Sequence, residues 1–427
     1  MSETGSDAER FSEHGTRRID TCRLCDATDL AEQVDFGFVA LGNNMQESEA
    51  AARAAPTYPL NIMRCGDCGH FQLGWAVDPR LLYATNYTYL SGIGASFVRH
   101  FEGYADWATA EARLEPGALV VDVGSNDGTC LKPFKARGMR VCGVDPASMP
   151  ARIANENGIE TLNDFFGPGA VDWIVERHGQ ADYVTSHNVL AHVDDLKATF
   201  LAVHALLKDG GYFGFEIGYF REVLRTGCFD TTYHEHLDYH TAEPLARHLT
   251  GLGFDLVDVS VNSVQGGSLR LLLRKTGKGE ILPRAQAFLA DESTSILQDD
   301  AFLKAWKPEI DAAMKRFGDA VRQRAARGER IFGYGAPTKA TLLMKLAGLG
   351  ADEVACIVED NALKQGRFMP GSGIPIVSTG TIDTNRPDAL VVFAWNFADD
   401  ILAKLAGRFD GHVEAIVPLP QLRIEAL

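Results

Sequence analysis

The chain of 427 residues contains no apolar run of 18 residues or more, so we expect no transmembrane helix. Positive charge is also scarce, because 41 Lys and Arg face 57 Asp and Glu and leave a formal net charge of −16. A duplex nucleic acid or an anionic membrane requires the opposite balance, so neither is an expected partner. A local basic pocket for a phosphate group remains compatible with this composition.

The first 20 residues lack the apolar segment of a secretory signal. We expect residues 1–20 to form a disordered tail and the protein to be cytoplasmic. Because thiols stay reduced in the cytoplasm, the eight cysteines are considered first as metal ligands or core residues.

Four of the cysteines form two Cys-x-x-Cys pairs, Cys22 with Cys25 and Cys65 with Cys68. Two such loops can supply four thiolates in a tetrahedron, and four protein ligands leave no open position, so the pattern favours a structural Zn²⁺. A chance pairing or a redox dithiol is the alternative. We predict a zinc-binding domain over residues 21–78, with little core of its own. Between the pairs, residues 35–37 predict a turn.

Strands and helices alternate after a mostly helical connector over residues 78–114. Apolar runs at residues 118–123, 141–144, 183–185 and 212–215 are typical of buried strands. Two further strands, joined by Gln265-Gly266-Gly267, predict a hairpin. A parallel sheet closed by an antiparallel edge pair is the outline of a class I methyltransferase, and we assign residues 79–280 to this domain.

A second alternating unit begins near residue 330, after a predicted helix over residues 301–327. It predicts a small Rossmann-like domain, which we place at residues 281–427, so the whole chain is expected to be α/β. Gly333-Tyr334-Gly335-Ala336 would present backbone amides at a helix N-terminus, and Lys339 follows one turn later. Lys364 follows the next strand. Phosphate binding is one interpretation of this unit, and a structural domain with an emptied nucleotide site is the other.

A glycine-rich turn follows the first strand of the central domain, with Asp122 before Gly124, Asn126 and Gly128. The next strand ends at Asp145, the position at which a carboxylate holds ribose hydroxyls. Dehydrogenases share such turns, but two features favour S-adenosylmethionine. Asp122 suits a cationic ligand and would repel a pyrophosphate, and Asn126 replaces the glycine that a pyrophosphate requires. Phe165 in the third strand unit could flank an adenine, and core packing explains it equally well.

Residues 231–240, Thr-Thr-Tyr-His-Glu-His-Leu-Asp-Tyr-His, hold the densest group of reactive side chains. They follow a strand, as do residues 186–192, so both groups should line one cleft. An imidazole can take up and return a proton near neutral pH. Glu235 could orient a histidine or bind a hydroxyl, and Tyr233 and Tyr87 could donate to an oxyanion. This set suits proton abstraction beside a carbonyl. A metal site is the alternative, although no HExxH spacing is present.

These motifs occur together in the order of a known family. The chain resembles the sugar C-methyltransferases of deoxysugar biosynthesis, which methylate carbon 3 of dTDP-linked 4-keto-6-deoxysugars, over nearly its whole length beyond Asp20. The resemblance rests on the two Cys-x-x-Cys pairs, Tyr87…Ser91-Gly92, Asp122-x-Gly124…Gly128, His187-Asn188-x-x-x-His192, Tyr233-His234-Glu235-His236-Leu237 and Gly333-Tyr334-Gly335-Ala336. It implies that His236 is the general base and that its companions are Tyr87, His192, Tyr233 and Glu235.

The family also implies a nucleotide-sugar cleft formed with the C-terminal domain, and we expect a monomer. The expected S-adenosylmethionine-binding residues are Asp122, Gly124, Asn126, Gly128, Asp145, Phe165 and Asn188. The expected substrate-binding residues are Tyr87, Tyr334, Lys339 and Lys364. Three alternatives stay open: an O- or N-methyltransferase of another small metabolite, a dehydrogenase, and a non-catalytic protein that binds partners through its zinc loops.

Overall fold

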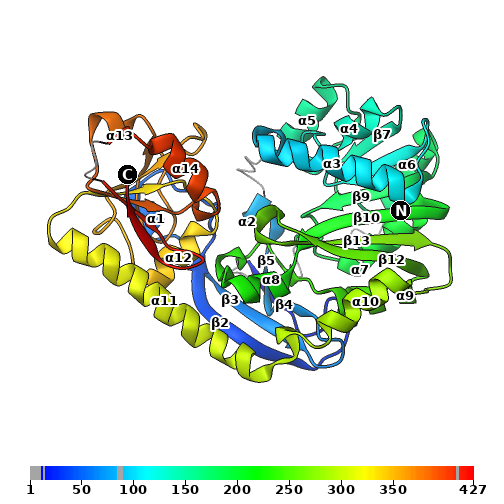
Figure 1. Ribbon diagram of the computed structural model, residues 1–427, viewed down its shortest axis with the longest axis horizontal. Coiled ribbons are helices and arrows are strands. Elements are labelled where there is room, and N and C mark those ends of the chain that lie inside the picture. Colours follow the sequence, from blue (N-terminus) through cyan, green and yellow to red (C-terminus); the bar gives the residue numbers. More distant parts are fainter. Residues whose placement is uncertain (1–10, 13–14, 84–89, 410–412) are drawn as a thin grey trace.

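The computed structural model describes residues 11–12, 15–83, 90–409 and 413–427, so Tyr87 lies outside the described residues. These residues form three large sheets and one small sheet of β1 (Thr16–Arg18) and β5 (Trp75–Val77). In Figure 1 the central sheet stands on the right, the C-terminal sheet on the left, and the N-terminal strands lie below and between them. Within the described ranges, no helix is long and apolar enough to span a membrane.

The central sheet has the strand order β12-β13-β10-β9-β6-β7-β8. Its strands are β6 (Leu119–Val123), β7 (Arg140–Val144), β8 (Thr161–Leu162), β9 (Ala181–His187), β10 (Leu207–Gly218), β12 (Phe254–Asn262) and β13 (Ser268–Lys275). Five strands are parallel, and β12 and β13 form an antiparallel hairpin, which confirms the predicted class I methyltransferase fold. The loops after β6, β7, β9 and β10 therefore lie at one edge of the sheet, where α/β proteins bind ligands.

Helices cover both faces of the central sheet (Figure 1). They are α3 (Ala95–Ala112), α4 (Leu131–Ala136), α5 (Ser148–Glu156), α6 (Pro168–His178), α7 (Leu196–Leu206), α9 (Ala242–Gly251) and α10 (Pro283–Glu292). Because both faces are covered, β6 is buried at all five positions, and its sequence Leu-Val-Val-Asp-Val is apolar except for the aspartate.

The C-terminal sheet has the order β16-β15-β14-β17-β18-β19. Its strands are β14 (Ile331–Tyr334), β15 (Cys356–Glu359), β16 (Ile376–Ser378), β17 (Ala389–Val392), β18 (Glu414–Val417) and β19 (Arg423–Ala426). All pairs are parallel except β18 with β19, which agrees with the predicted Rossmann-like unit. The helices α12 (Ala340–Ala347) and α14 (Ala398–Leu405) follow β14 and β17.

The N-terminal sheet contains β2 (Leu30–Ala40), β3 (Thr57–Cys65) and β4 (Phe71–Leu73). Its fourth strand is β11 (Asp238–Tyr239), which comes from the histidine-rich segment of the central domain and pairs antiparallel with β4. The predicted turn at residues 35–37 is wrong. Gly37, with φ of 68°, instead forms a bulge within β2, where Asp35 Oδ1 accepts its backbone N–H at 2.6 Å.

The N-terminal domain, which we expected to have little hydrophobic core of its own, packs its buried residues against another domain. Val34, Phe36, Leu60 and Ile62 are buried in a hydrophobic cluster that it shares with the C-terminal part of the chain. The long helix α11 (Asp300–Ala326) completes this cluster, because it contacts both β2 and α12. In Figure 1 it runs from the C-terminal sheet to the N-terminal strands, so the two domains are held together by shared apolar packing.

Candidate active site and zinc centre

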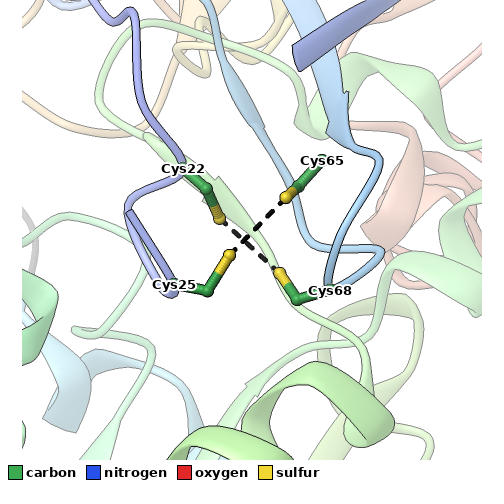
Figure 2. Close-up of side chains that lie close together, drawn as sticks. All are labelled: Cys22, Cys25, Cys65 and Cys68. Atoms are coloured by element: carbon green, nitrogen blue, oxygen red, sulfur yellow. Dashed lines mark hydrogen bonds between the residues drawn. The ribbon is translucent and has the colours of Figure 1, made fainter. Parts of the chain in front are cut away.

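The four paired cysteines converge from two loops on one point (Figure 2). The Cys22 and Cys68 Sγ atoms lie 3.6 Å apart, as do those of Cys25 and Cys65, and all four sulfur atoms lie within 4.8 Å of one another. Four Zn–S bonds of about 2.3 Å at tetrahedral angles place sulfur atoms about 3.8 Å apart. All eight cysteines of the chain are free. The residues therefore fit a structural zinc ion with four thiolate ligands.

The glycine-rich turn after β6, the predicted cofactor site, has a backbone that approaches its neighbours closely. Gly124 and Gly128 have φ of 73° and 76°, and Asn126 also has a positive φ, of 50°. A side chain at Gly124 would lie 2.2 Å from Val189, so only glycine allows this approach to the loop after β9. Asp122 is buried beneath the turn, and within the part of the chain described its Oδ1 has no hydrogen-bond partner. Burial raises the pKa of this carboxyl, and an ammonium group would stabilise its ionised form.

The other expected cofactor residues follow other parallel strands of the same sheet. Asp145 follows β7 and accepts the backbone N–H groups of Asn126 and Ala147, each at 2.8 Å. Asn188, with φ of 57°, follows β9 in the loop that meets Gly124. Phe165 follows β8 and is 67% exposed. Core packing therefore does not explain Phe165, and its ring is free to stack on a planar ligand.

His236 is held by a hydrogen bond at each ring nitrogen. Its Nδ1 lies 2.8 Å from the carbonyl oxygen of Thr231, which can only accept, so Nδ1 carries the proton. Burial lowers the pKa of His236 well below its ordinary value, and the ring is therefore neutral at pH 7. The Tyr233 hydroxyl then donates to the lone pair of Nε2 at 2.7 Å. The structure thus presents Nε2, and not Nδ1, as the basic atom.

The loop after β9 joins this histidine to the cofactor turn. The His192 ring packs edge-to-face on His236 with ring centres 4.7 Å apart, and burial lowers the pKa of His192 to about 4. Ala191 accepts a hydrogen bond from the backbone of Leu237 at 2.7 Å, and Val189 contacts Gly124. One short loop therefore contacts the cofactor turn at its beginning and the basic histidine at its end.

Glu235 belongs to a hydrogen-bonded chain that connects the N- and C-terminal domains. Its Oε1 accepts Asn43 Nδ2 at 3.0 Å, and Asn43 in turn accepts the Thr338 hydroxyl at 2.6 Å. Asn43 follows β2, and Thr338 precedes α12. Glu235 is 3% exposed, and in the described residues its Oε2 has no partner. The sequence did not indicate Asn43 or Thr338, because Asn43 lies 192 residues from Glu235.

Glu235→Gln should remove a pH-dependent loss of stability. Burial raises the pKa of Glu235 to about 7, well above the value of about 4.3 in an unfolded chain. The folded protein then holds a proton that unfolding releases, so stability falls as pH rises through 7. Between pH 6 and 8 the wild type should lose about 1.4 kcal/mol more free energy of unfolding than the variant, measured by urea unfolding. Exposed Glu309→Gln is the control, and identical pH dependence of Glu235→Gln and wild type would contradict the assignment.

The expected substrate-binding residues of the C-terminal domain all have protein partners. Tyr334 donates to Asp360 at 3.2 Å and accepts from Lys404 at 3.0 Å. Lys364 Nζ donates to the carbonyl oxygen of Ala336 at 2.9 Å, in the turn after β14. Lys339 is described below with its partners. These contacts place the side chains beside the turn, and substrate binding by them stays a prediction.

Lys339 extends toward the histidine-rich segment of the central domain. Its Nζ lies 3.6 Å from Asp230 Oδ2 and 4.1 Å from the centre of the Trp395 ring. Trp395 Nε1 donates to the same Asp230 oxygen at 2.5 Å. Asp230 is fully buried and immediately precedes Thr231, which holds His236. Neither Asp230 nor Trp395 was predicted, because no local pattern marks two residues 165 positions apart as partners.

Two other histidines of the motifs have structural contacts. His234 is buried and its Nε2 lies 3.2 Å from the carbonyl oxygen of Tyr58. His187 shares the Glu216 carboxylate with His100, and Arg270 forms an ion pair with its second oxygen at 2.5 Å. Because that arginine already neutralises the carboxylate, this group suits a buried hydrogen-bond network better than a metal site.

Three family descriptions match successive parts of the chain: a zinc binding domain over residues 22–83, a methyltransferase domain over residues 98–259, and a C-methyltransferase C-terminal domain over residues 263–420. The chain is 32% identical over 409 residues to C-methyltransferase NovU of Streptomyces niveus, covering 96% of this chain and 97% of NovU.

Two further likenesses are confined to part of the chain. A ubiquinone biosynthesis O-methyltransferase of Bordetella bronchiseptica is 32% identical over 108 residues, which is 25% of this chain and 45% of that protein. The crystal structure of magnesium protoporphyrin IX methyltransferase from Synechocystis PCC 6803 with bound S-adenosylmethionine has 17% identity and a TM-score of 0.33, covering 42% of this chain and 79% of that one. The likeness to C-methyltransferase NovU, by contrast, spans nearly the whole of both chains.

Proposed function

Because the chain belongs to the C-methyltransferase family of NovU and is an S-adenosylmethionine-dependent enzyme with a zinc site, we propose that it methylates carbon 3 of a dTDP-linked 4-keto-6-deoxysugar. The observation that carries this proposal is the neutral His236, whose Nε2 has a lone pair that can accept a proton. The loop after β9 contacts both this histidine and the glycine-rich turn after β6. A carbon beside a carbonyl needs such a base before it can accept a methyl group, whereas an oxygen or nitrogen acceptor often needs only proximity.

In this proposal the substrate C–H takes the place of the Tyr233 hydroxyl at His236 Nε2. His236 removes the proton from carbon 3, and the electron pair of the C–H bond moves toward the carbonyl oxygen. The displaced Tyr233 hydroxyl can then donate to that developing oxyanion, which stabilises the charge. The imidazolium formed on His236 is held by Nδ1–H donation to Thr231 and later releases its proton to solvent. When bound, S-adenosylmethionine would supply the electrophilic methyl group: the electron pair left on carbon 3 would form the new carbon–methyl bond, the methyl–sulfur bond would break, and S-adenosylhomocysteine would leave.

The cofactor would be held by the turn after β6, with Asp122 facing its ammonium group, Asp145 near the ribose and Phe165 against the adenine. The nucleotide of the sugar would face the turn after β14, near Tyr334 and Lys364. Lys339 already lies beside Asp230, so its ammonium group would have to contact both this carboxylate and the phosphate. His192 and Glu235 would line the sugar site beside His236.

The proposal is tested by hydrogen exchange and by the position of the new methyl group. In D₂O with S-adenosylhomocysteine, the enzyme should introduce deuterium at carbon 3 of the keto-sugar nucleotide, observed by proton NMR, well above the rate in an enzyme-free control. With ¹³C-methyl-labelled S-adenosylmethionine, the label should appear in a carbon-bound methyl group. A methoxy or N-methyl product without exchange would instead identify an O- or N-methyltransferase.

A further inference from the structure

Arg23 lies inside the first zinc loop, between Cys22 and Cys25, yet its side chain is only 5% exposed. Its guanidinium extends away from the loop toward the central domain. Nε donates to both carboxylate oxygens of Asp238, at 3.0 and 3.1 Å, and a terminal nitrogen donates to the carbonyl oxygen of Val193 at 2.5 Å. Arg23 therefore reaches two segments that are separated in sequence from it and from each other.

Those two segments carry the two histidines of the site. Asp238 lies two residues after His236, and Val193 directly follows His192. The planar guanidinium has a fixed spacing between its donors, so it sets the distance between its two partners. In this arrangement the His192 ring packs edge-to-face on the His236 ring.

Other contacts hold the same segments against the zinc domain. The backbone N–H of Leu73 in β4 donates to the carbonyl oxygen of Leu237 at 2.9 Å, next to the β4–β11 pair. His70, two residues after Cys68, lies 2.9 Å from Asp238 Oδ1. Asp238 is fully buried, and its pKa is held at about 2: burial raises it, but Arg23 and His70 lower it more. The need to neutralise a buried carboxylate explains why Arg23 pairs with Asp238. It does not explain why Arg23 also donates a hydrogen bond to Val193.

We infer that Arg23 is a positioning residue for methyl transfer, which fixes His236 against His192 from within the zinc loop. The inference rests on the proposed function, because it assumes that His236 acts on the substrate. Arg23 touches no reacting atom and acts through Asp238 and Val193. The zinc domain thereby contributes to turnover although its metal has no open coordination position.

The test compares Arg23→Gln and Arg23→Lys with Arg247→Gln. Arg247 also contacts a zinc loop, through the carbonyl oxygen of Asp67 at 3.3 Å, but it has an exposed side chain and is the matched control. Arg23→Gln should lower kcat by on the order of 100-fold, because small displacements of a base have effects of this size. KM, zinc content and S-adenosylhomocysteine affinity should stay within about twofold. Arg23→Lys keeps a positive charge beside Asp238 and should fold. A single ammonium group cannot donate to both Asp238 and Val193 in the fixed geometry of a guanidinium, so the kcat of this variant should also fall.

Three measurements separate the outcomes. Guanidinium ion should restore part of the activity of Arg23→Gln but none of the activity of His236→Asn. Equal kcat in Arg23→Lys and wild type, with zinc retained in both, would overturn the positioning role. If His236→Asn kept full hydrogen exchange at carbon 3, the proposed function would fail. If exchange were lost in His236→Asn but unchanged in Arg23→Gln, only the Arg23 inference would be rejected.

Discussion

Replacing His236 by Asn is expected to reduce turnover and carbon 3 hydrogen exchange by roughly 10²- to 10⁴-fold, the usual contribution of a general base. The Asn amide can still donate to the Thr231 carbonyl, as Nδ1 does, but it cannot accept a proton at the position of Nε2. Single-turnover methylation and deuterium exchange measure the loss. Affinity for S-adenosylhomocysteine should not change, because the cofactor turn after β6 is intact.

The matched control for this variant is His204→Asn on α7, where the histidine packs on Phe254 with ring centres 5.2 Å apart. This variant should retain wild-type exchange and turnover. Burial lowers the pKa of His236, so its imidazole should still be neutral just below pH 6.5. The fall in turnover rate that protonation of His236 causes should therefore occur below that pH. An exchange rate of His236→Asn equal to that of the wild type would show that another group takes the proton.

Cys22→Ser is expected to release the zinc ion and to destabilise the N-terminal domain by at least about 3 kcal/mol. A serine hydroxyl replaces one of the four thiolates in the tetrahedron, and the two loops then lose the crosslink between them. Zinc content, measured by atomic emission, should fall from one ion per chain toward none, and the thermal unfolding midpoint should fall with it. Turnover should be lost as well, because β4 and Arg23 hold the segment of His236.

Cys356→Ser provides the comparison for that experiment. Cys356 is a buried free thiol in β15, remote from the paired cysteines in sequence and placed in another sheet. Its substitution should cost some stability without loss of zinc. Full zinc occupancy in Cys22→Ser would mean that Cys22 is not a ligand.

The sequence predicted those elements whose backbone conformation is set by residues adjacent in the chain. The apolar run at residues 119–123 is a buried strand, the glycine-rich turn adopts the left-handed conformations that its glycines allow, and the two strands around Gly266 form a hairpin. The two Cys-x-x-Cys spacings predicted the zinc site for the same reason, because each pair is a local loop whose ligand geometry is set within four residues. The prediction for residues 35–37 was wrong because a glycine with positive φ serves a bulge as readily as a turn.

The sequence by itself therefore determined which chemical groups this protein has and the local backbone that presents them: four thiolates, a cofactor turn and a histidine-rich segment. Only the tertiary structure decided how these groups meet. The pairing of β11 with β4, the Arg23 bond to Asp238 across 215 residues and the Trp395 bond to Asp230 bring three domains to one histidine. Such contacts depend on which surfaces the packed sheets place opposite one another, and a local sequence pattern contains no information about a partner that is distant along the chain.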